Sequence, residues 1–135
     1  MNVTLRGKRQ HHRTVSFDAL SNSVVLIEQR LLPHEFRLVK TRDYRETAEA
    51  ITTMVVRGAG AIGATAAYGL AQGARAFRGS RLDRFETHIE AVYQTLKDAR
   101  PTAVDPVNAM NAIREEMAMG ETVSERQDIA FAAAS

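Results

Sequence analysis

The stretch Val55-Val56-Arg57-Gly58-Ala59-Gly60-Ala61-Ile62-Gly63 is the part of the sequence around which the rest of the chain is organised. It places one arginine beside three glycines and leads into the alanine-rich segment 64–71. A glycine-rich turn lets backbone N–H groups approach a ligand closely, and a following helix directs its partly positive N-terminus to the same point. The guanidinium of Arg57 adds a forked set of donors that suits phosphate oxygens. The pattern indicates either an anion site, with phosphate as the expected ligand, or a tight turn between two packed helices.

The same glycines, Gly58, Gly60 and Gly63, also spell the G-x-G-x-x-G pattern of dinucleotide-binding folds. That pattern requires a buried strand before the glycines and an acidic residue at the end of a second strand about 20 positions later. Residues 44–56 instead space their apolar positions at three- and four-residue intervals, which favours a helix. Asp83 stands at a suitable distance, but the arginine-rich segment before it is unsuited to a buried strand. The spacing therefore disfavours a nucleotide site without eliminating it.

The composition is that of an ordinary globular domain. The 135 residues suit one domain, with 44% hydrophobic residues, 25% charged residues and a formal net charge of +2, which is too small to indicate nucleic acid as a partner. The chain has no cysteine, so it can form no disulfide and supply no thiolate. No signal peptide is visible, and the longest uncharged stretch, 58–74, is too short and too rich in glycine for a membrane span. We expect a soluble, cytoplasmic protein with no membrane partner.

Two periodicities divide the chain. Short runs with strand character at 14–17, 24–27 and 36–39 predict a three-stranded antiparallel meander. From Asp43 onward the spacing is helical, and the predicted helices cover 44–56, 61–78, 82–99, a segment between Asp105 and Gly120, and a segment from Thr122 towards the end. The expected fold class is α+β: a small three-stranded antiparallel sheet followed by a bundle of about five helices. A basic tail is expected over residues 1–13.

Several helix boundaries carry local signals. Asp105 followed by proline reads as an N-cap with proline in the first helical position, and Thr122 with Glu125 forms a capping-box pattern. Glycines inside the helix predicted over 61–78 cost about 1 kcal/mol each relative to alanine, so we expect close helix or ligand approach there. The fifth helix has no stop signal. We therefore expect a chain cut off before its natural boundary, with Ile129, Ala130 and Phe131 left uncovered.

Other charged clusters suggest little chemistry. The basic run 6–13 is typical of a solvated tail, with nucleic-acid binding as the weaker alternative. His11 and His12 are adjacent, so their side chains diverge and no metal site is expected. Glu86 and Glu90 flank the apolar face of the third helix and could form an acid/base pair, although a solvated helix edge explains them more simply.

The central stretch resembles a known motif. Residues 56–63 followed by Ala66-Ala67-Tyr68-Gly69 look like the V-R-G-A-P-A-I-G…A-A-Y-G motif of methylthioribose-1-phosphate isomerases, and residues 100–105 resemble their R-P-T-A-V-N motif. Leu32-Pro33 after Glu28-Gln29 is similar to the family's D-Q…L-P. The wider superfamily includes ribose-1,5-bisphosphate isomerases and initiation factor 2B regulatory subunits. The resemblance covers about residues 14–120.

The resemblance implies a mixed N-terminal domain, over residues 14–135, that is normally followed by a Rossmann-like C-terminal domain. It assigns binding of the sugar phosphate to Arg57, Gly58, Ala59 and Arg100, with no cofactor and no metal. Arg100 could alternatively cap the carbonyl groups that end the third helix. Two departures stand out: Gly60 replaces the motif's proline, as in the bisphosphate branch, and Asp105 replaces its asparagine.

The resemblance places the catalytic cysteine and aspartate in the C-terminal domain, which we expect to be absent from this chain. Moving a proton between C1 and C2 of the opened sugar needs a positioned acid and base. We therefore expect a methionine-salvage, aldose–ketose isomerase fragment that is inactive alone and converts methylthioribose 1-phosphate to methylthioribulose 1-phosphate only with its missing C-terminal half. The expected partners are a phosphorylated sugar and either a homo-oligomer or the missing C-terminal domain. The alternatives are a non-catalytic, initiation factor 2B-like regulatory or ligand-sensing module and, more remotely, an oxidoreductase. Keeping both Arg57 and Arg100 favours the isomerase.

Overall fold

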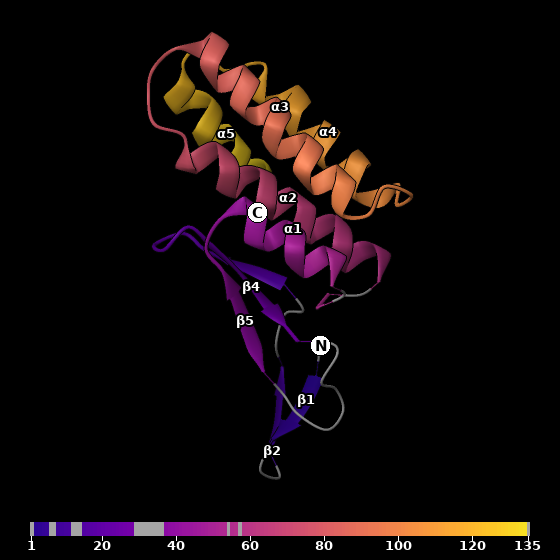
Figure 1. The fold of residues 1–135 in the computed structure, drawn as a ribbon. Helices are drawn as coiled ribbons and strands as arrows, with labels where there is room; N and C mark the ends of the chain where they lie inside the picture. The colour runs from indigo at the N-terminus through magenta and orange to yellow at the C-terminus, as the bar shows by residue number, and fades with distance from the viewer. Residues whose placement is uncertain are drawn as a thin grey trace.

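The computed structural model of the chain describes residues 2–5, 8–11, 15–28, 37–53, 55–56 and 58–134. In chain order its elements are β1 (Asn2–Leu5), β2 (Lys8–His11), β3 (Val15–Asp18), β4 (Ser23–Ile27), β5 (Leu38–Thr41), α1 (Tyr44–Thr52), α2 (Ala59–Ala76), α3 (Leu82–Ala99), α4 (Asp105–Met117) and α5 (Val123–Ala134). The helices form a bundle that lies at one end of the strands (Figure 1). The predicted α+β class, with a three-stranded antiparallel sheet followed by five helices, is confirmed.

The three-stranded sheet has the order β3-β4-β5, and both pairings are antiparallel. Phe17, Val24 and Thr41 stand opposite one another across the three strands. The central strand β4 is the most buried, as its run of Val and Leu residues requires. The third strand was predicted to begin at Phe36, which lies outside the described residues, and β5 begins two residues later at Leu38, opposite Ile27.

Strands β1 and β2 form a separate two-stranded antiparallel sheet within the range that we assigned to a basic tail. Their register pairs Asn2 with His11 and Leu5 with Lys8. We did not predict this hairpin from the sequence, because its strands are short and carry no clear alternation of apolar and polar residues.

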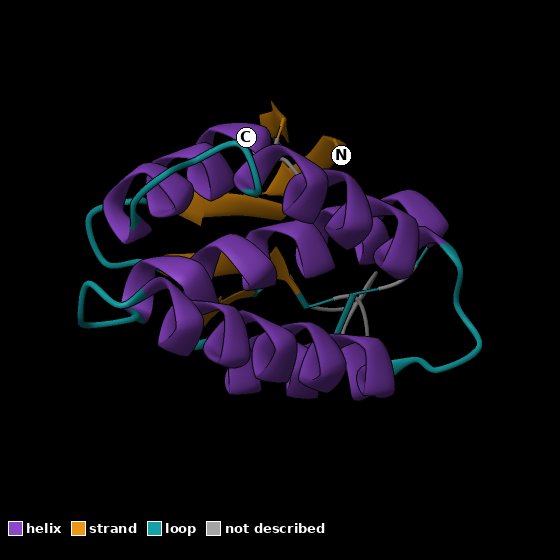
Figure 2. Ribbon diagram, turned by 90° about the horizontal axis from the view of Figure 1, so that it is seen from above, coloured by secondary structure: helices purple, strands orange, loops and turns teal. Residues whose placement is uncertain are grey.

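Helix α2 is the centre of the helical bundle and contacts each of the other four helices as well as β3 and β4. In Figure 2 the helices lie close together over the strands. The close approach expected around the α2 glycines is confirmed at two of them. A Cβ on Gly69 would lie 2.9 Å from Leu96 Cδ2, and a Cβ on Gly73 would lie 2.7 Å from both Cγ atoms of Val92. Glycine at these positions therefore allows α3 to pack directly on the α2 backbone.

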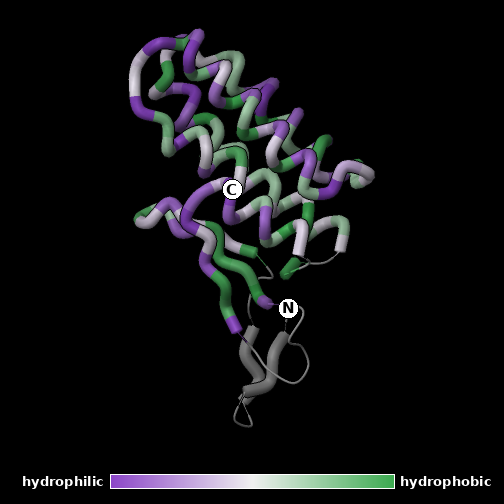
Figure 3. Tube along the Cα trace, in the orientation of Figure 1, coloured by the Kyte–Doolittle hydropathy of each residue, from purple (hydrophilic) through white to green (hydrophobic). Residues whose placement is uncertain are grey.

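Most helices are amphipathic. Hydrophobic and hydrophilic residues alternate along the helical part of the chain (Figure 3). The buried residues of the helices are mainly hydrophobic. On α3 the buried residues are the predicted set Phe85, Ile89, Val92, Tyr93 and Leu96. None of the helices within the described ranges is long and apolar enough to cross a membrane.

Two predicted boundaries were wrong. Helix α1 ends at Thr52 rather than at residue 56, and Thr53 follows as its C-cap with its N–H bonded to Glu49 O. Asp105 is not the N-cap of α4: Val104 holds that position, and no side chain caps the helix. Asp105 instead occupies the first helical turn, where a carboxylate is favoured by the partial positive charge of the helix N-terminus. The backbone of the α3–α4 loop, rather than a side-chain cap, therefore sets where α4 begins.

The capping box that opens α5 is confirmed. Thr122 Oγ1 accepts a hydrogen bond from the Glu125 N–H at 3.1 Å, and Glu125 Oε2 accepts from the Thr122 N–H at 3.2 Å. Glu86 and Glu90, considered above as an acid/base pair, are each engaged by an arginine of another helix. They form separate ion pairs across the helices, Glu86 with Arg126 at 3.0 Å and Glu90 with Arg114 at 2.8 Å.

The expectation that the apolar residues of α5 lie uncovered was wrong. Ala130 is 0% exposed, and Ile129 is half-buried. The Phe131 ring lies 5.6 Å from the Phe17 ring and beneath the guanidinium of Arg75 at 4.8 Å. Helix α5 therefore packs on α2 and β3 instead of exposing an apolar face.

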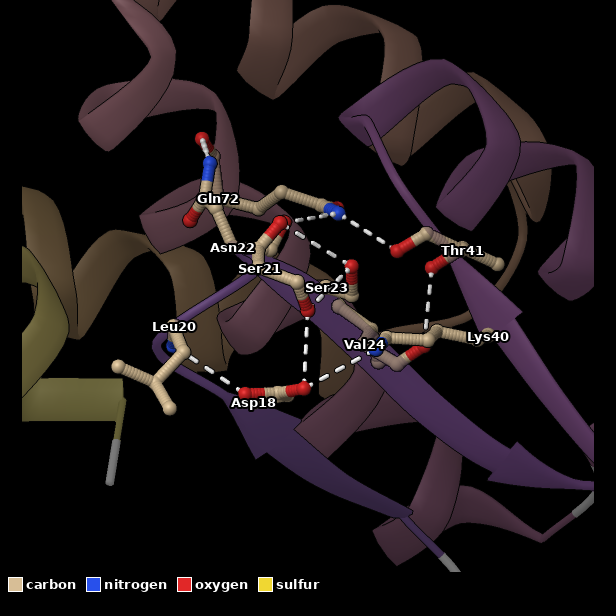
Figure 4. Close-up of polar contacts among 9 residues, drawn as sticks. All are labelled: Asp18, Leu20, Ser21, Asn22, Ser23, Val24, Lys40, Thr41 and Gln72. Atoms are coloured by element: carbon tan, nitrogen blue, oxygen red, sulfur yellow. Dashed lines mark hydrogen bonds and ion pairs between the residues drawn. The ribbon is translucent and has the colours of Figure 1, made fainter.

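A buried polar network joins the sheet to α2 (Figure 4). Gln72 on α2 is 0% exposed, and its Nε2 donates to the backbone carbonyls of Asn22 at 3.0 Å and Thr41 at 2.9 Å. Its Oε1 accepts a hydrogen bond from Thr47 of α1 at 2.6 Å. Buried polar groups are tolerated only when they are hydrogen-bonded, so this network specifies how the sheet docks on the helices.

Candidate functional site

A pocket with a volume of about 380 Å³ lies where α2 and α4 begin and α3 ends. We call it the α2–α4 pocket. Its lining residues are Gly58, Ala59, Ile62, Arg100, Ala103, Val104, Asp105 and Pro106. Three of the four residues that the resemblance assigned to phosphate binding, Gly58, Ala59 and Arg100, therefore line one pocket.

Gly58 sets the geometry of the α2 side of the pocket. Its φ of 89° lies in the left-handed region, which favours glycine, and it is the residue immediately before the helix. The first hydrogen bond of α2 runs from the Ile62 N–H to Gly58 O at 2.9 Å. The N–H groups of Ala59, Gly60 and Ala61 precede that bond and have no partner within the helix. Such a set of amides, at the positive end of a helix, can hold an anion.

Arg100 supplies the positive side chain of the lining. It is half-buried and ends α3, and its backbone N–H donates to Lys97 O at 3.3 Å. Its guanidinium forms no hydrogen bond or ion pair with any residue of the described ranges, so these contacts do not support the alternative in which the side chain caps α3. The last carbonyl of α3 instead accepts a hydrogen bond from Thr52, whose Oγ1 donates to Ala99 O at 3.3 Å. The Arg100 side chain is therefore available to a ligand.

Arg57, the fourth predicted residue, lies outside the described residues, as does Met54. The two residues between them are anchored in the core: Val55 is 5% exposed and Val56 is fully buried. The Val55 N–H bonds to Ala50 O at 3.0 Å. Residues 55–56 are thus held against the end of α1.

The residues on the α4 side of the pocket were only partly recognised in the sequence. Asp105 was noted only as an altered cap, and Val104, which is 65% exposed, was not singled out. Helix α4 begins next to Gly63 of α2, since a Cβ on Gly63 would make ordinary van der Waals contact with Asp105 O at 3.5 Å. The sequence did contain a signal for both residues, because Val104 and Asp105 belong to the same short motif, residues 100–105, as Arg100.

The lining can bind an anion but offers little chemistry beyond that. Among the described lining residues Arg100 is the cation, Asp105 is the carboxylate, and the others are glycine or apolar. A guanidinium and backbone amides stabilise phosphate through charge-assisted hydrogen bonds. Proton transfer at a sugar carbon needs a separate acid and base, which this set does not provide.

The profile of the Initiation factor 2 subunit family matches residues 55–135, which include the whole pocket. The chain belongs to that family. It is also similar to proteins named methylthioribose-1-phosphate isomerase. The one from Brucella anthropi is 42% identical over 109 residues, which cover 81% of this chain and 28% of that protein.

Two solved structures extend the comparison to the fold. The 5-methylthioribose 1-phosphate isomerase of Pyrococcus horikoshii OT3 matches with a TM-score of 0.85 and 39% identity, covering 93% of this chain and 35% of that chain. The delta subunit of translation initiation factor eIF-2B from A. fulgidus matches with a TM-score of 0.84 and 31% identity, covering 92% of this chain and 36% of that chain. This chain therefore spans about a third of the length of these members of the family.

Proposed function

We propose that this chain is the substrate-binding part of an aldose–ketose isomerase of the methylthioribose-1-phosphate type. The observation that carries the proposal is the grouping of Gly58, Ala59 and Arg100 around one pocket, although Arg100 is far from the two others in the sequence. In this proposal the phosphate accepts hydrogen bonds from the first amides of α2 and from Arg100, with Arg57 as a further donor.

The conversion of methylthioribose 1-phosphate to methylthioribulose 1-phosphate would then require a second part. The resemblance attributes the acid–base chemistry to a cysteine and an aspartate of the C-terminal domain, and these 135 residues contain no cysteine. The relatives are about three times as long, which leaves room in them for such a domain. The cytoplasmic location, the role in methionine salvage and the homo-oligomeric assembly remain predictions from the sequence.

The proposal is tested by titrating the ¹⁵N-labelled chain with methylthioribose 1-phosphate and following the backbone amide signals. We expect saturable shifts at Ala59, Gly60 and Ala61, and an affinity that falls as salt is raised, because a partly exposed charge pair is screened. Replacing Arg100 by alanine should weaken binding about tenfold.

Arg84→Ala is the matched control, since Arg84 is an exposed arginine near the opposite end of the same helix. An 18-residue helix is about 27 Å long, so this variant should leave the affinity within about twofold. Equal losses in both variants, or shifts confined to another part of the chain, would refute the proposed site.

A second candidate is a regulatory or ligand-sensing module. The observation that favours it is the close structural similarity to the initiation factor 2B delta subunit. The titration distinguishes the isomerase from a protein-binding form of this module. A purely protein-binding scaffold has no use for Arg57 together with Arg100, and it would show no amide shifts with the sugar phosphate.

A further inference from the structure

We infer that a groove between α3, α4 and α5 is a second binding site, for a small molecule that joins an apolar body to a carboxylate. We call it the α3–α5 groove. It is lined by Phe85, Glu86 and Ile89 from α3, by Arg114, Met117 and Ala118 from α4 and its C-cap, and by Arg126 from α5. It shares no lining residue with the α2–α4 pocket, so the inference does not depend on the proposed function.

The floor of the groove is apolar. Phe85 and Ile89 lie one turn apart on α3, and Met117 comes from the last turn of α4. All three side chains are buried, whereas Ala118 is exposed at the rim. Contact with such a floor removes the apolar part of a ligand from water, which is the main source of affinity in most small-molecule sites.

The size of the groove limits the ligand. Its volume is about 210 Å³, the space of about seven water molecules at roughly 30 Å³ each. Sites for drug-sized ligands are larger, at about 300–1,000 Å³. The groove therefore suits a molecule of about ten non-hydrogen atoms, such as a benzene ring that carries a short acid.

Two arginines reach the groove from different helices. Arg114 of α4 pairs with Glu90 at 2.8 Å, and Arg126 of α5 pairs with Glu86 at 3.0 Å. Because Glu86 and Glu90 are one turn apart on α3, the two guanidinium groups lie along the same part of that helix. The structure thus already places carboxylates at both guanidinium groups, which indicates the class of anion that a ligand would carry.

Each guanidinium keeps donors that no described residue uses. A guanidinium has five N–H groups, whereas Arg114 donates through Nη2 alone and Arg126 through Nη1 and Nε. The Nε of Arg126 donates to Gly120 O at 2.9 Å, so this side chain is held in place before a ligand arrives. Only 17% of the Arg126 side chain is exposed, and reduced contact with water strengthens its attraction for an anion.

The glutamates at the rim can give way to a ligand. The side chain of Glu86 is 63% exposed and that of Glu90 is 58% exposed, and ion pairs so open to solvent hold their partners weakly. A ligand gains burial of its apolar body on the floor in addition to the charge pair. Its carboxylate can therefore replace Glu86 beside Arg126.

The test titrates the ¹⁵N-labelled chain with phenylacetate and, in parallel, with the uncharged phenylacetamide. We expect saturable amide shifts at Ile89, Met117 and Ala118, with a Kd of about 1–10 mM for phenylacetate and at least about fivefold weaker binding of phenylacetamide. Glu86→Gln removes the competing carboxylate. It should tighten phenylacetate about fivefold and leave phenylacetamide within about twofold.

Glu115→Gln is the matched control, because Glu115 is an exposed glutamate of α4 that does not line the groove. It should leave both affinities within about twofold. Ala118→Leu, which fills the rim at an exposed position, should weaken both ligands at least about fivefold.

Three results would overturn the inference. One is equal affinity for phenylacetate and phenylacetamide, and another is weaker binding of phenylacetate to Glu86→Gln than to the wild type. The third is the absence of saturable shifts at the groove amides up to about 50 mM. Phenylacetate shifts confined to Ala59, Gly60 and Ala61 belong to this third result, because they would place the anion in the α2–α4 pocket and leave the proposed function standing.

Discussion

Asn22 and Gln72 each donate a side-chain amide hydrogen to the backbone carbonyl of the other, and both bonds measure 3.0 Å. Asn22 stands in the turn between β3 and β4 with a φ of 52°, while Gln72 lies in the middle of α2. Arg75, one turn further along α2, donates to Asn22 Oδ1 at 3.2 Å. The pair therefore fixes the turn of the sheet to the central helix, which in turn positions Gly58 at the pocket.

Gln72→Met should destabilise the fold by about 2 kcal/mol. The substitution keeps the volume of the side chain but leaves the carbonyls of Asn22 and Thr41 without their donor in a buried place. The free energy of unfolding, measured with urea, checks this. Gln94→Met, at an exposed position of α3, is the control and should cost less than about 0.5 kcal/mol. Similar losses in both variants would show that the network does not contribute specifically.

Gly73→Ala should destabilise the fold by about 1–3 kcal/mol, although alanine is the better helix former. The reason is steric, since the new Cβ would lie 2.7 Å from both Cγ atoms of Val92. Thermal or urea unfolding measures the effect, and Val92→Ala in the same chain should recover part of the loss.

The control for this prediction is Gly60→Ala near the start of α2. Nothing lies within 4 Å of a Cβ at that position, so the change should be neutral or stabilise the fold by up to about 1 kcal/mol. If Gly73→Ala were as harmless as Gly60→Ala, the direct packing of α3 on α2 would be wrong.

The contribution of Asp18 to stability should depend on pH. Lys40, 3.0 Å away, and a hydrogen bond from Ser21 lower the pKa of Asp18 in the folded chain. Because the folded pKa is below the unfolded one, the stabilisation is present above the unfolded pKa and is lost as the pH falls through the folded pKa. The difference in unfolding free energy between wild type and Asp18→Asn should therefore shrink from about pH 5 to about pH 2.

Asp128→Asn serves as the comparison for the pH series, because Asp128 is exposed on α5 and no ion pair involves it in the described part of the chain. This variant measures how much of any pH dependence comes from removing an exposed aspartate in general rather than from the pair of Asp18 with Lys40. Added salt should also reduce the Asp18 effect, since the pair with Lys40 is exposed to solvent. A pH-independent Asp18→Asn difference would contradict the prediction.

The chain by itself should not isomerise methylthioribose 1-phosphate. It has no cysteine, and the described pocket lining holds no second group that could pair with Asp105 as acid and base. Product formation, followed by chromatography, should equal the rate without protein, while the full-length Brucella anthropi relative serves as the positive control. Turnover clearly above the uncatalysed rate would show that the chemistry resides in these residues.

Much of the fold was determined by interactions between neighbours in the sequence. The spacing of Phe85, Ile89 and Leu96 specifies the buried face of α3, and the capping box of Thr122 and Glu125 specifies where α5 begins. Such signals act within a turn or two of helix, so they can be read without knowing the rest of the chain. The glycines of α2 are also a signal of this kind. Glycine destabilises a helix relative to alanine, so its presence in α2 indicates close packing, although it does not identify the helix that packs there.

The candidate site was only partly contained in the sequence. The motif resemblance selected Gly58, Ala59 and Arg100, but their meeting at one pocket depends on how α3 and α4 pack around α2. The same packing placed Asp105 and Val104 in the lining, covered Ala130, and buried Gln72 against the turn at Asn22. Crossing angles between helices and the docking of a sheet result from the summed contacts of side chains that are distant in sequence, and no local pattern encodes them. Only the tertiary structure therefore decided which charges share the pocket.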